Sequence, residues 1–469
     1  MTELHLVDPK QNPNLSGRFA PVHRELEATD LTVDGDLPAD LAGAYVRNGP
    51  NPKFPPLGSY TYPMEGDGML HGLWFESGRV RYRNRWVTTR GLAAEERAGK
   101  ALFGGIMTPA FVDPSLLGPD PDPGWPTKLD AFVNVVRHAG RYLALEEGLP
   151  AYEVTPELET VDRYDWAGGL AKGVTAHPKI DPVTGEMVVF RYDTEAPFLT
   201  WAVVGPDGAV THPETPVESV DEGYMIHDFA ITERHLVLTI APATFDLAAM
   251  LAGGPLLVWK PELGTRIAVI GRDGSAPTRW IETDAFWVWH FANAHDVGDT
   301  IEMDFPMWTA PGFLTPGAAN TCTYVRAVLA PEQGTIDITP LHEAVADFPR
   351  IDDRLIGQAH RYAILTAVSG RAKGLTPGEH DALCRVDRQT GAWDEHETQG
   401  AVGEAVFVPR AGSHDELDGY YLAFVTALTG NHTTLRIWDA ADFPGPPRAS
   451  VRMPQRVPNG LHGNWFAAT

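Results

Sequence analysis

Four of the 17 histidines in the chain have neighbours that suit metal binding. Each is flanked by apolar, aromatic, glycine or proline residues, and neutral imidazole is a common ligand of transition metals. They are His177, His227, His290 and His462. Their successive separations of 50, 63 and 172 residues exclude a local zinc finger, and the chain has no HExxH helix. Spacing alone leaves two interpretations open: ordinary structural histidines, or ligands delivered by distant parts of one scaffold.

The scaffold that would carry these histidines is predicted to be built from many short strands. Runs rich in β-branched and aromatic residues recur along the chain, as at 186–192, 235–240 and 420–425. The 46 glycines and 40 prolines are spread between such runs, where they act as turns. Helical periodicity is weak and is best at 93–103 and 245–251. This pattern predicts an all-β sandwich, barrel or propeller, and a propeller accommodates 1–469 most easily as one domain.

Composition narrows the function classes. The chain has 37 Lys and Arg against 62 Asp and Glu, a formal net charge of −25, which excludes a nucleic-acid-binding surface. No apolar run is long enough to span a membrane, and residues 1–16 lack the apolar core of a signal peptide. Cys322 and Cys384 are too few for a disulfide framework. We therefore expect a cytoplasmic protein.

The histidine motifs belong to a longer set that covers nearly the whole chain. The other motifs are Gly-Ala-Tyr-Val-Arg-Asn-Gly-Pro-Asn-Pro at 43–52, Glu-Gly-Asp-Gly-Met-Leu-His-Gly at 65–72, Phe-Pro-Arg-Ile-Asp at 348–352, and Gly403-Glu404 followed by Phe-Val-Pro at 407–409. With this set the chain resembles the carotenoid cleavage oxygenase family, which includes stilbene-cleaving oxygenases. The resemblance implies a seven-bladed β-propeller with a few helices, with long loops capping the active-site face, and with one Fe(II) per chain.

The resemblance also implies roles for individual residues. The four histidines match the iron ligands of the family, and three carboxylates match the groups that support them: Glu147, Asp347 and Glu404. Asp347 stands where the family usually has glutamate. Its side chain is one methylene shorter, so the bond to histidine is either lost or water-bridged, weakening iron binding by up to about 10–100-fold, or kept by a small backbone shift.

The resemblance also implies a class of substrate. The family cleaves an electron-rich C=C bond with O2 into two carbonyl products. Stilbene-cleaving members anchor a phenol with a tyrosine and a lysine, and the matching positions here are Ile106 and Glu146. The absence of this tyrosine and lysine favours a carotenoid or apocarotenoid as the substrate. Alternatives are cleavage of a stilbene or phenylpropenoid to aromatic aldehydes, the isomerase activity of one branch of the family, and a non-catalytic propeller that binds a polyene.

Several apolar residues are candidates for the substrate and O2 pocket. Val133 matches a position near the open side of the iron, and Phe286, Trp287 and Trp308 could line a tunnel for an apolar conjugated alkene. Each has an alternative role as an ordinary core residue. The apolar segment 245–259 is either a core helix and strand or a patch for peripheral contact with a membrane.

Overall fold

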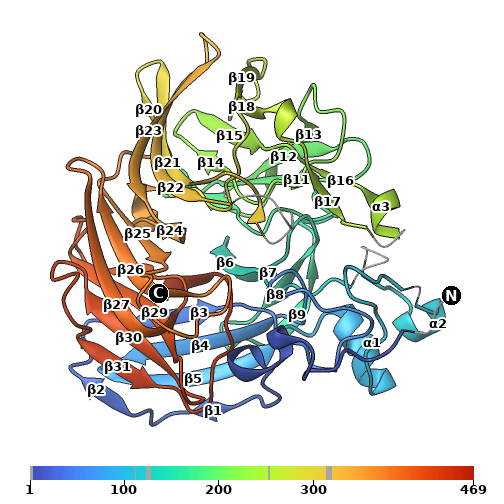
Figure 1. Ribbon diagram of the computed structural model, residues 1–469, viewed down its shortest axis with the longest axis vertical. Helices are drawn as coiled ribbons and strands as arrows, with labels where there is room; N and C mark the ends of the chain where they lie inside the picture. Colours follow the sequence, from blue (N-terminus) through green and yellow to red (C-terminus); the bar gives the residue numbers. More distant parts are fainter. Residues whose placement is uncertain (1–3, 111, 123–127, 252–253, 313–319, 469) are drawn as a thin grey trace. The chain divides into compact units, whose positions relative to one another are not determined.

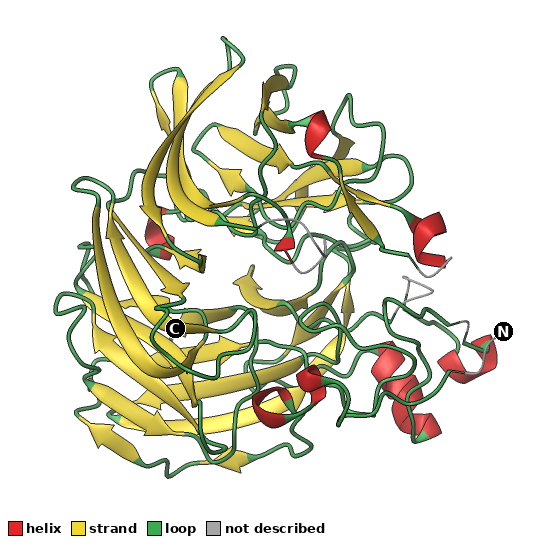
Figure 2. Ribbon diagram, in the orientation of Figure 1, coloured by secondary structure: helices red, strands yellow, loops and turns green. Residues whose placement is uncertain are grey.

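The computed structural model describes residues 4–110, 112–122, 128–251, 254–312 and 320–468. Strands dominate it and the helices are few and short (Figure 2). The chain divides into two compact units: Met1–Val174 with Leu422–Trp438 and Pro447–Thr469, and Thr175–Tyr421 with Asp439–Pro446. No helix among the described residues is long and apolar enough to cross a membrane.

The first unit contains a sheet that joins strands from near both ends of the chain (Figure 1). Its order is β1 (Glu27–Ala28), β5 (Arg79–Trp86), β4 (Met69–Glu76), β3 (Gly43–Arg47) and β32 (Gly463–Ala467). In β5 four arginines alternate with Val80, Tyr82, Asn84 and Trp86, and every residue of the second set is buried. This period of two fixes which face of the strand points to the core.

A second sheet of this unit is a simple antiparallel meander. It comprises β6 (Asn134–His138), β7 (Arg141–Leu145), β8 (Ala151–Val154) and β9 (Thr160–Tyr164). The unit also holds α1 (Arg90–Ala98) and α2 (Pro114–Leu117). Thr89 caps α1 by accepting a bond from the Leu92 amide at 3.1 Å, and Gly99 ends it in a left-handed conformation. The helix therefore begins and ends earlier than the predicted 93–103.

The second unit contains three four-stranded antiparallel sheets and one hairpin. The sheets are β10 (Lys179–Ile180), β11 (Met187–Tyr192), β12 (Leu199–Val204) and β13 (Val210–Pro216); β14 (Ala230–Ile231), β15 (His235–Ile240), β18 (Thr265–Gly271) and β19 (Arg279–Thr283); and β20 (Asn293–Val297), β21 (Thr300–Trp308), β22 (Cys322–Ala330) and β23 (Thr335–Glu343). The hairpin of β16 (Ala243–Phe245) and β17 (Leu257–Trp259) encloses α3 (Leu247–Leu251). The segment 245–259 thus forms a helix and strand, with 252–253 outside the described residues.

The remaining strands form a nine-stranded sheet. Its order is β2 (Val33–Gly35), β31 (Ala449–Arg452), β30 (Thr433–Asp439), β29 (Gly419–Ala427), β27 (Ala392–Val402), β26 (His380–Asp387), β25 (Tyr362–Ala367) and β24 (Ala346–Arg350), with β28 (Val406–Pro409) paired to β29. Strands β24–β27 and the four strands from β29 to β2 are two sets of four. With the other sheets and without the hairpin, they make seven sets of four or five strands. This number matches the predicted number of blades.

A buried charge network fixes β21 in the second unit. Asp304 is fully buried and accepts a hydrogen bond from the Tyr324 hydroxyl. Its Oδ1 lies 3.3 Å from His360 Nε2 and 3.2 Å from Arg388 Nε. Burial alone would raise the pKa of Asp304, but His360 and Arg388 hold that pKa below its usual value. Because Asp304 pairs with Asn293 at the start of β20, the network also holds the strand that follows His290.

We expect Asp304→Asn to lower the free energy of unfolding by about 1–3 kcal/mol, because Arg388 and His360 lose a buried charged partner while Arg388 keeps its ion pair with Glu302. Chemical denaturation measures this, and Asp337→Asn on the exposed side of β23 is the matched control. Equal stabilities of the two variants would contradict the proposed importance of the network.

Candidate metal centre

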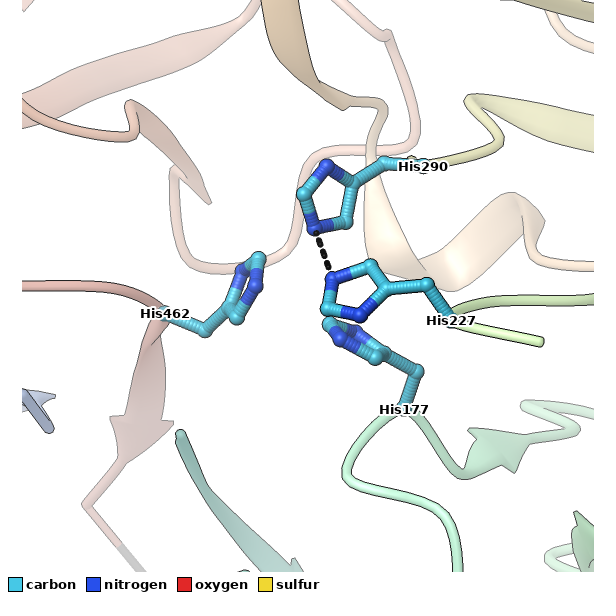
Figure 3. Close-up of side chains that lie close together, drawn as sticks. All are labelled: His177, His227, His290 and His462. Atoms are coloured by element: carbon cyan, nitrogen blue, oxygen red, sulfur yellow. Dashed lines mark hydrogen bonds between the residues drawn. The ribbon is translucent and has the colours of Figure 1, made fainter. Parts of the chain in front are cut away.

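The four predicted histidines lie together, and their rings point toward one another (Figure 3). One ring nitrogen from each of His177, His227, His290 and His462 can be chosen so that all four lie within 4.8 Å of one another. The Nε2 atoms of His227 and His290 are 3.1 Å apart. Two nitrogens bound at about 2.1 Å to one metal at a right angle would be about 3.0 Å apart. The donor set therefore fits a single transition-metal ion.

Each histidine occupies a similar place in a sheet. His177, His227 and His290 lie two or three residues before β10, β14 and β20, and each of these is the first strand of its sheet. His462 directly precedes β32, which is also an edge strand. Repetition of one sheet topology thus explains how histidines 50 to 172 residues apart in sequence can supply ligands to one point.

Asp228 connects the three histidine segments of the second unit. Its Oδ2 accepts a hydrogen bond from the Phe291 amide at 2.9 Å, and its Oδ1 pairs with Lys179 Nζ at 2.7 Å. Asp228 follows His227, Phe291 follows His290, and Lys179 comes two residues after His177. Sequence reasoning missed this role, although the aspartate directly beside a candidate ligand was a signal for it.

Asp347 reaches His290 without a water bridge. Its Oδ1 lies 2.8 Å from His290 Nδ1, and its Oδ2 accepts a hydrogen bond from Trp308 Nε1 at 3.2 Å. The register of β24 against β25 shifts between Asp347 and Arg350, and Phe348 has a φ of 55°. Of the two outcomes expected for the shorter side chain, the structure shows the one in which the backbone keeps the bond.

His462 is held by backbone bonds within the first unit. Its amide donates to the Val133 carbonyl at 3.2 Å, and its carbonyl accepts from the Asn48 amide at 2.9 Å. The Asn48 side chain, which is fully buried, donates to the carbonyls of Ala131 and Asn134. The structure therefore places the predicted pocket residue Val133 directly against this histidine.

The other two predicted carboxylates lie in turns. Glu147 is half-buried between β7 and β8, and Glu404 is buried between β27 and β28, where its Oε2 lies 3.2 Å from Arg350 Nη1. Arg350 also bonds Asp353, so this cation is shared between two carboxylates. The support that Glu147 and Glu404 give to histidines stays a prediction.

The predicted tunnel residues occupy two different environments. Phe286 packs in the core against Phe305, with ring centroids 5.8 Å apart. Trp287 pairs with Trp308 through two backbone hydrogen bonds of 2.8 Å. The Trp287 ring contacts Trp289, whose ring lies 5.2 Å from that of His227. Phe348, which was not predicted from the sequence to lie at the site, stacks on His290 at 5.1 Å.

Ile106 and Glu146 line the same cavity, which has a volume of about 110 Å³ and lies within Met1–Val174. Glu146 Oε2 accepts hydrogen bonds from the amides of Asp130 and Ala131 at 2.6 and 2.8 Å. Burial raises the pKa of Glu146 to about 7, against the effect of these bonds. The two positions singled out for substrate recognition are thus brought together.

Four histidines that converge in this way, three of them buried, on a scaffold of repeated antiparallel sheets, define a metal-binding β-propeller protein. A family model described as retinal pigment epithelial membrane protein matches residues 19–467. The chain therefore belongs to the family of carotenoid cleavage oxygenases and their relatives, and its all-β propeller fold is confirmed.

Three comparisons show how far the similarity extends. The chain is 34% identical to isoeugenol monooxygenase of Pseudomonas nitroreducens over 97% of this chain and 98% of that protein. It is 30% identical to a carotenoid cleavage oxygenase of Mycobacterium tuberculosis, over 98% of both. The crystal structure of Pseudomonas brassicacearum lignostilbene dioxygenase covers 98% of this chain and 99% of its own, with a TM-score of 0.89 and 30% identity.

Removal of the Asp347 carboxylate should weaken metal binding. We expect Asp347→Ala to lower Fe(II) affinity by about 10–100-fold, because His290 loses the partner that fixes its ring and its proton on Nδ1. Competition with a coloured chelator measures the affinity, and Asp353→Ala, which removes an exposed carboxylate of the same segment, is the control. Unchanged affinity in Asp347→Ala would show that the bond at 2.8 Å does not support the site.

The pKa of Glu146 predicts a pH dependence of stability. The folded protein holds this proton more tightly than the unfolded chain, whose glutamates titrate near pH 4.3, so the contribution of Glu146 to the wild-type free energy of unfolding falls as pH rises from about 4.3 to about 7. Glu146→Gln has no proton to lose, so its stability relative to wild type should rise over that range by roughly 1–3 kcal/mol. Denaturant unfolding at several pH values tests this, with the exposed Glu76→Gln as control. A constant difference between Glu146→Gln and wild type would contradict the raised pKa.

Proposed function

We propose that the chain is a non-haem Fe(II) dioxygenase that cleaves a conjugated C=C bond with O2 into two carbonyl products. We further propose that His177, His227, His290 and His462 hold the iron. The observation that carries the proposal is the convergence of these four histidines, with Asp347 bonded behind His290. Four neutral imidazoles leave the ion its full charge and open coordination positions.

Fe(II) bound there would supply the electronic means for O2 to react with an alkene. The protein's own contribution is orientation. Asp347 accepts the Nδ1 proton of His290, which directs the Nε2 lone pair toward the other rings. Trp289 and Phe348 cover His227 and His290 with apolar surface, which limits water near the site. The reaction balances without a further reductant, because the two oxygen atoms of O2 become the two carbonyl oxygens.

The leading substrate class is a carotenoid or apocarotenoid. Ile106 and Glu146 support it, since they replace the tyrosine and lysine with which stilbene-cleaving relatives would anchor a phenol. An aryl alkene is the second candidate, which the similarity to isoeugenol monooxygenase and lignostilbene dioxygenase supports. A cytoplasmic location, peripheral contact with membranes through an apolar patch and the absence of a nucleic-acid partner stay predictions.

The decisive experiment is product analysis with iron-loaded protein. Apocarotenals, isoeugenol and stilbenes are incubated with ¹⁸O2, and mass spectrometry identifies the carbonyl products and their label. We expect one labelled oxygen in each product if exchange with water is suppressed. His227→Ala and His290→Ala should lose more than about 100-fold in rate, because each removes a metal ligand, whereas exposed His414→Ala should not.

Full activity in His227→Ala would refute the assigned ligands. No iron uptake and no turnover of any alkene would instead support the non-catalytic polyene-binding alternative. Isomerised alkene without cleavage would support the isomerase alternative.

A further inference from the structure

The carboxylate of Asp347 accepts hydrogen bonds from three different residues. Its Oδ1 accepts the Nδ1 proton of His290 at 2.8 Å and the amide proton of Phe348 at 2.8 Å. Its Oδ2 accepts the indole Nε1 proton of Trp308 at 3.2 Å. Asp347 is only 6% exposed, and a buried carboxylate is tolerated when donors satisfy its charge. Both oxygens of this group are therefore committed to partners within the protein.

The bond from Trp308 constrains the carboxylate in a way that the two bonds on Oδ1 do not. The torsion that turns an aspartate carboxylate about its Cβ–Cγ bond is intrinsically broad, so the side chain alone does not set the plane of the carboxylate. Two donors on one oxygen leave the position of the other oxygen open. Trp308 fixes Oδ2, and with it the plane in which Oδ1 meets His290 Nδ1. The carboxylate is thus held at two points.

Trp308 is itself tied to the segment that carries His290. It is the last residue of β21, it is buried, and it pairs with Trp287 through two backbone hydrogen bonds of 2.8 Å. Trp287 precedes His290 by three residues. The contacts that lead from His290 to Asp347, then to Trp308 and then to Trp287 therefore return to the same segment of chain. A turn of the His290 ring would break one of these bonds or displace a backbone pair.

The main chain of Asp347 is fixed separately from its carboxylate. Asp347 pairs with Thr366 of β25, and the Thr366 hydroxyl donates a hydrogen bond to the Asp347 carbonyl at 3.0 Å. The same hydroxyl oxygen lies 2.8 Å from His380 Nδ1, and both Thr366 and His380 are buried. With the main chain held in this way, the freedom left to Asp347 is rotation of its side chain. The bond from Trp308 removes that rotation.

We propose that Trp308 is a positioning residue of the metal centre, which acts on the ligand His290 through Asp347. The sequence predicts Trp308 in the lining of a tunnel, and the bond to Asp347 adds a role at the metal. His290, Trp308 and Asp347 all belong to the unit Thr175–Tyr421. The inference rests on the metal-binding part of the proposed function and is independent of which alkene is cleaved.

Trp308→Phe tests the proposal, because it keeps an aromatic ring and removes the indole N–H. Co(II) is the probe, and its dissociation constant is measured from the visible absorption of the loaded protein in competition with a chelator. We expect this constant to rise about 3–30-fold, less than in Asp347→Ala, because His290 keeps a bond to a carboxylate that is less constrained. Trp201→Phe is the matched control, since it removes the same atoms from a buried tryptophan of the same unit, and its affinity should equal that of wild type.

A double-mutant cycle separates positioning from a merely structural role. If Trp308 acts through Asp347, adding Trp308→Phe to Asp347→Ala should cost little further affinity for Co(II), whereas independent structural effects would add. A second measurement keeps the proposal testable if Trp308→Phe does not fold. In protein labelled with ¹⁵N in the tryptophan indoles, one N–H signal should shift both when Zn(II) is added to wild type and when metal-free Asp347→Ala is compared with metal-free wild type.

The outcomes separate the two proposals. No uptake of Fe(II) or Co(II) by wild type refutes the proposed function. Uptake by wild type with equal affinity in Trp308→Phe, or additive losses in the double variant, overturns the inference and leaves the proposed function standing. An equal loss in Trp308→Phe and Trp201→Phe, or the absence of an indole signal that shifts in both labelling experiments, overturns the inference in the same way.

Discussion

The buried carboxylate of Asp228 is the interaction on which three of the four histidines depend. Its side chain is only 2% exposed, and both of its oxygens have partners that lie next to histidine segments. An unpaired carboxylate in this place would cost several kcal/mol, so the Lys179 cation and the Phe291 amide have little freedom to move away. The same pairing that makes burial of the charge tolerable therefore fixes the backbones beside His177, His227 and His290.

This constraint matters because neutral imidazole rings do not attract one another when their nitrogen lone pairs face the same point. Two neutral rings with Nε2 atoms 3.1 Å apart either share a proton or oppose their lone pairs. The scaffold must hold them at that distance until an ion takes up the lone pairs. Asp228 does so through the backbone, and Asp347 does so through the ring of His290, so the two aspartates complement each other.

Sequence motifs singled out four histidines that the structure brings together, because each motif is local and each lies just before an edge strand of a sheet. The bond from Asp347 to His290 was undecided from sequence, since it depends on a register shift and on the left-handed backbone of Phe348. For an aromatic residue that conformation costs of order 1–2 kcal/mol. Stacking of Phe348 on His290 and the Trp308 bond to Asp347 are tertiary contacts that help to offset this cost, and no local pattern reveals them.

The surroundings of Glu146 were hidden for a similar reason. A sequence shows that a carboxylate replaces a lysine, but it does not show which oxygen the backbone occupies and which one faces the cavity. The cavity lining is acidic, as the whole chain is. Its carboxylates outnumber its single lysine, and the net charge of the chain is −25. A surface of this kind would repel anionic substrates and anionic lipid alike.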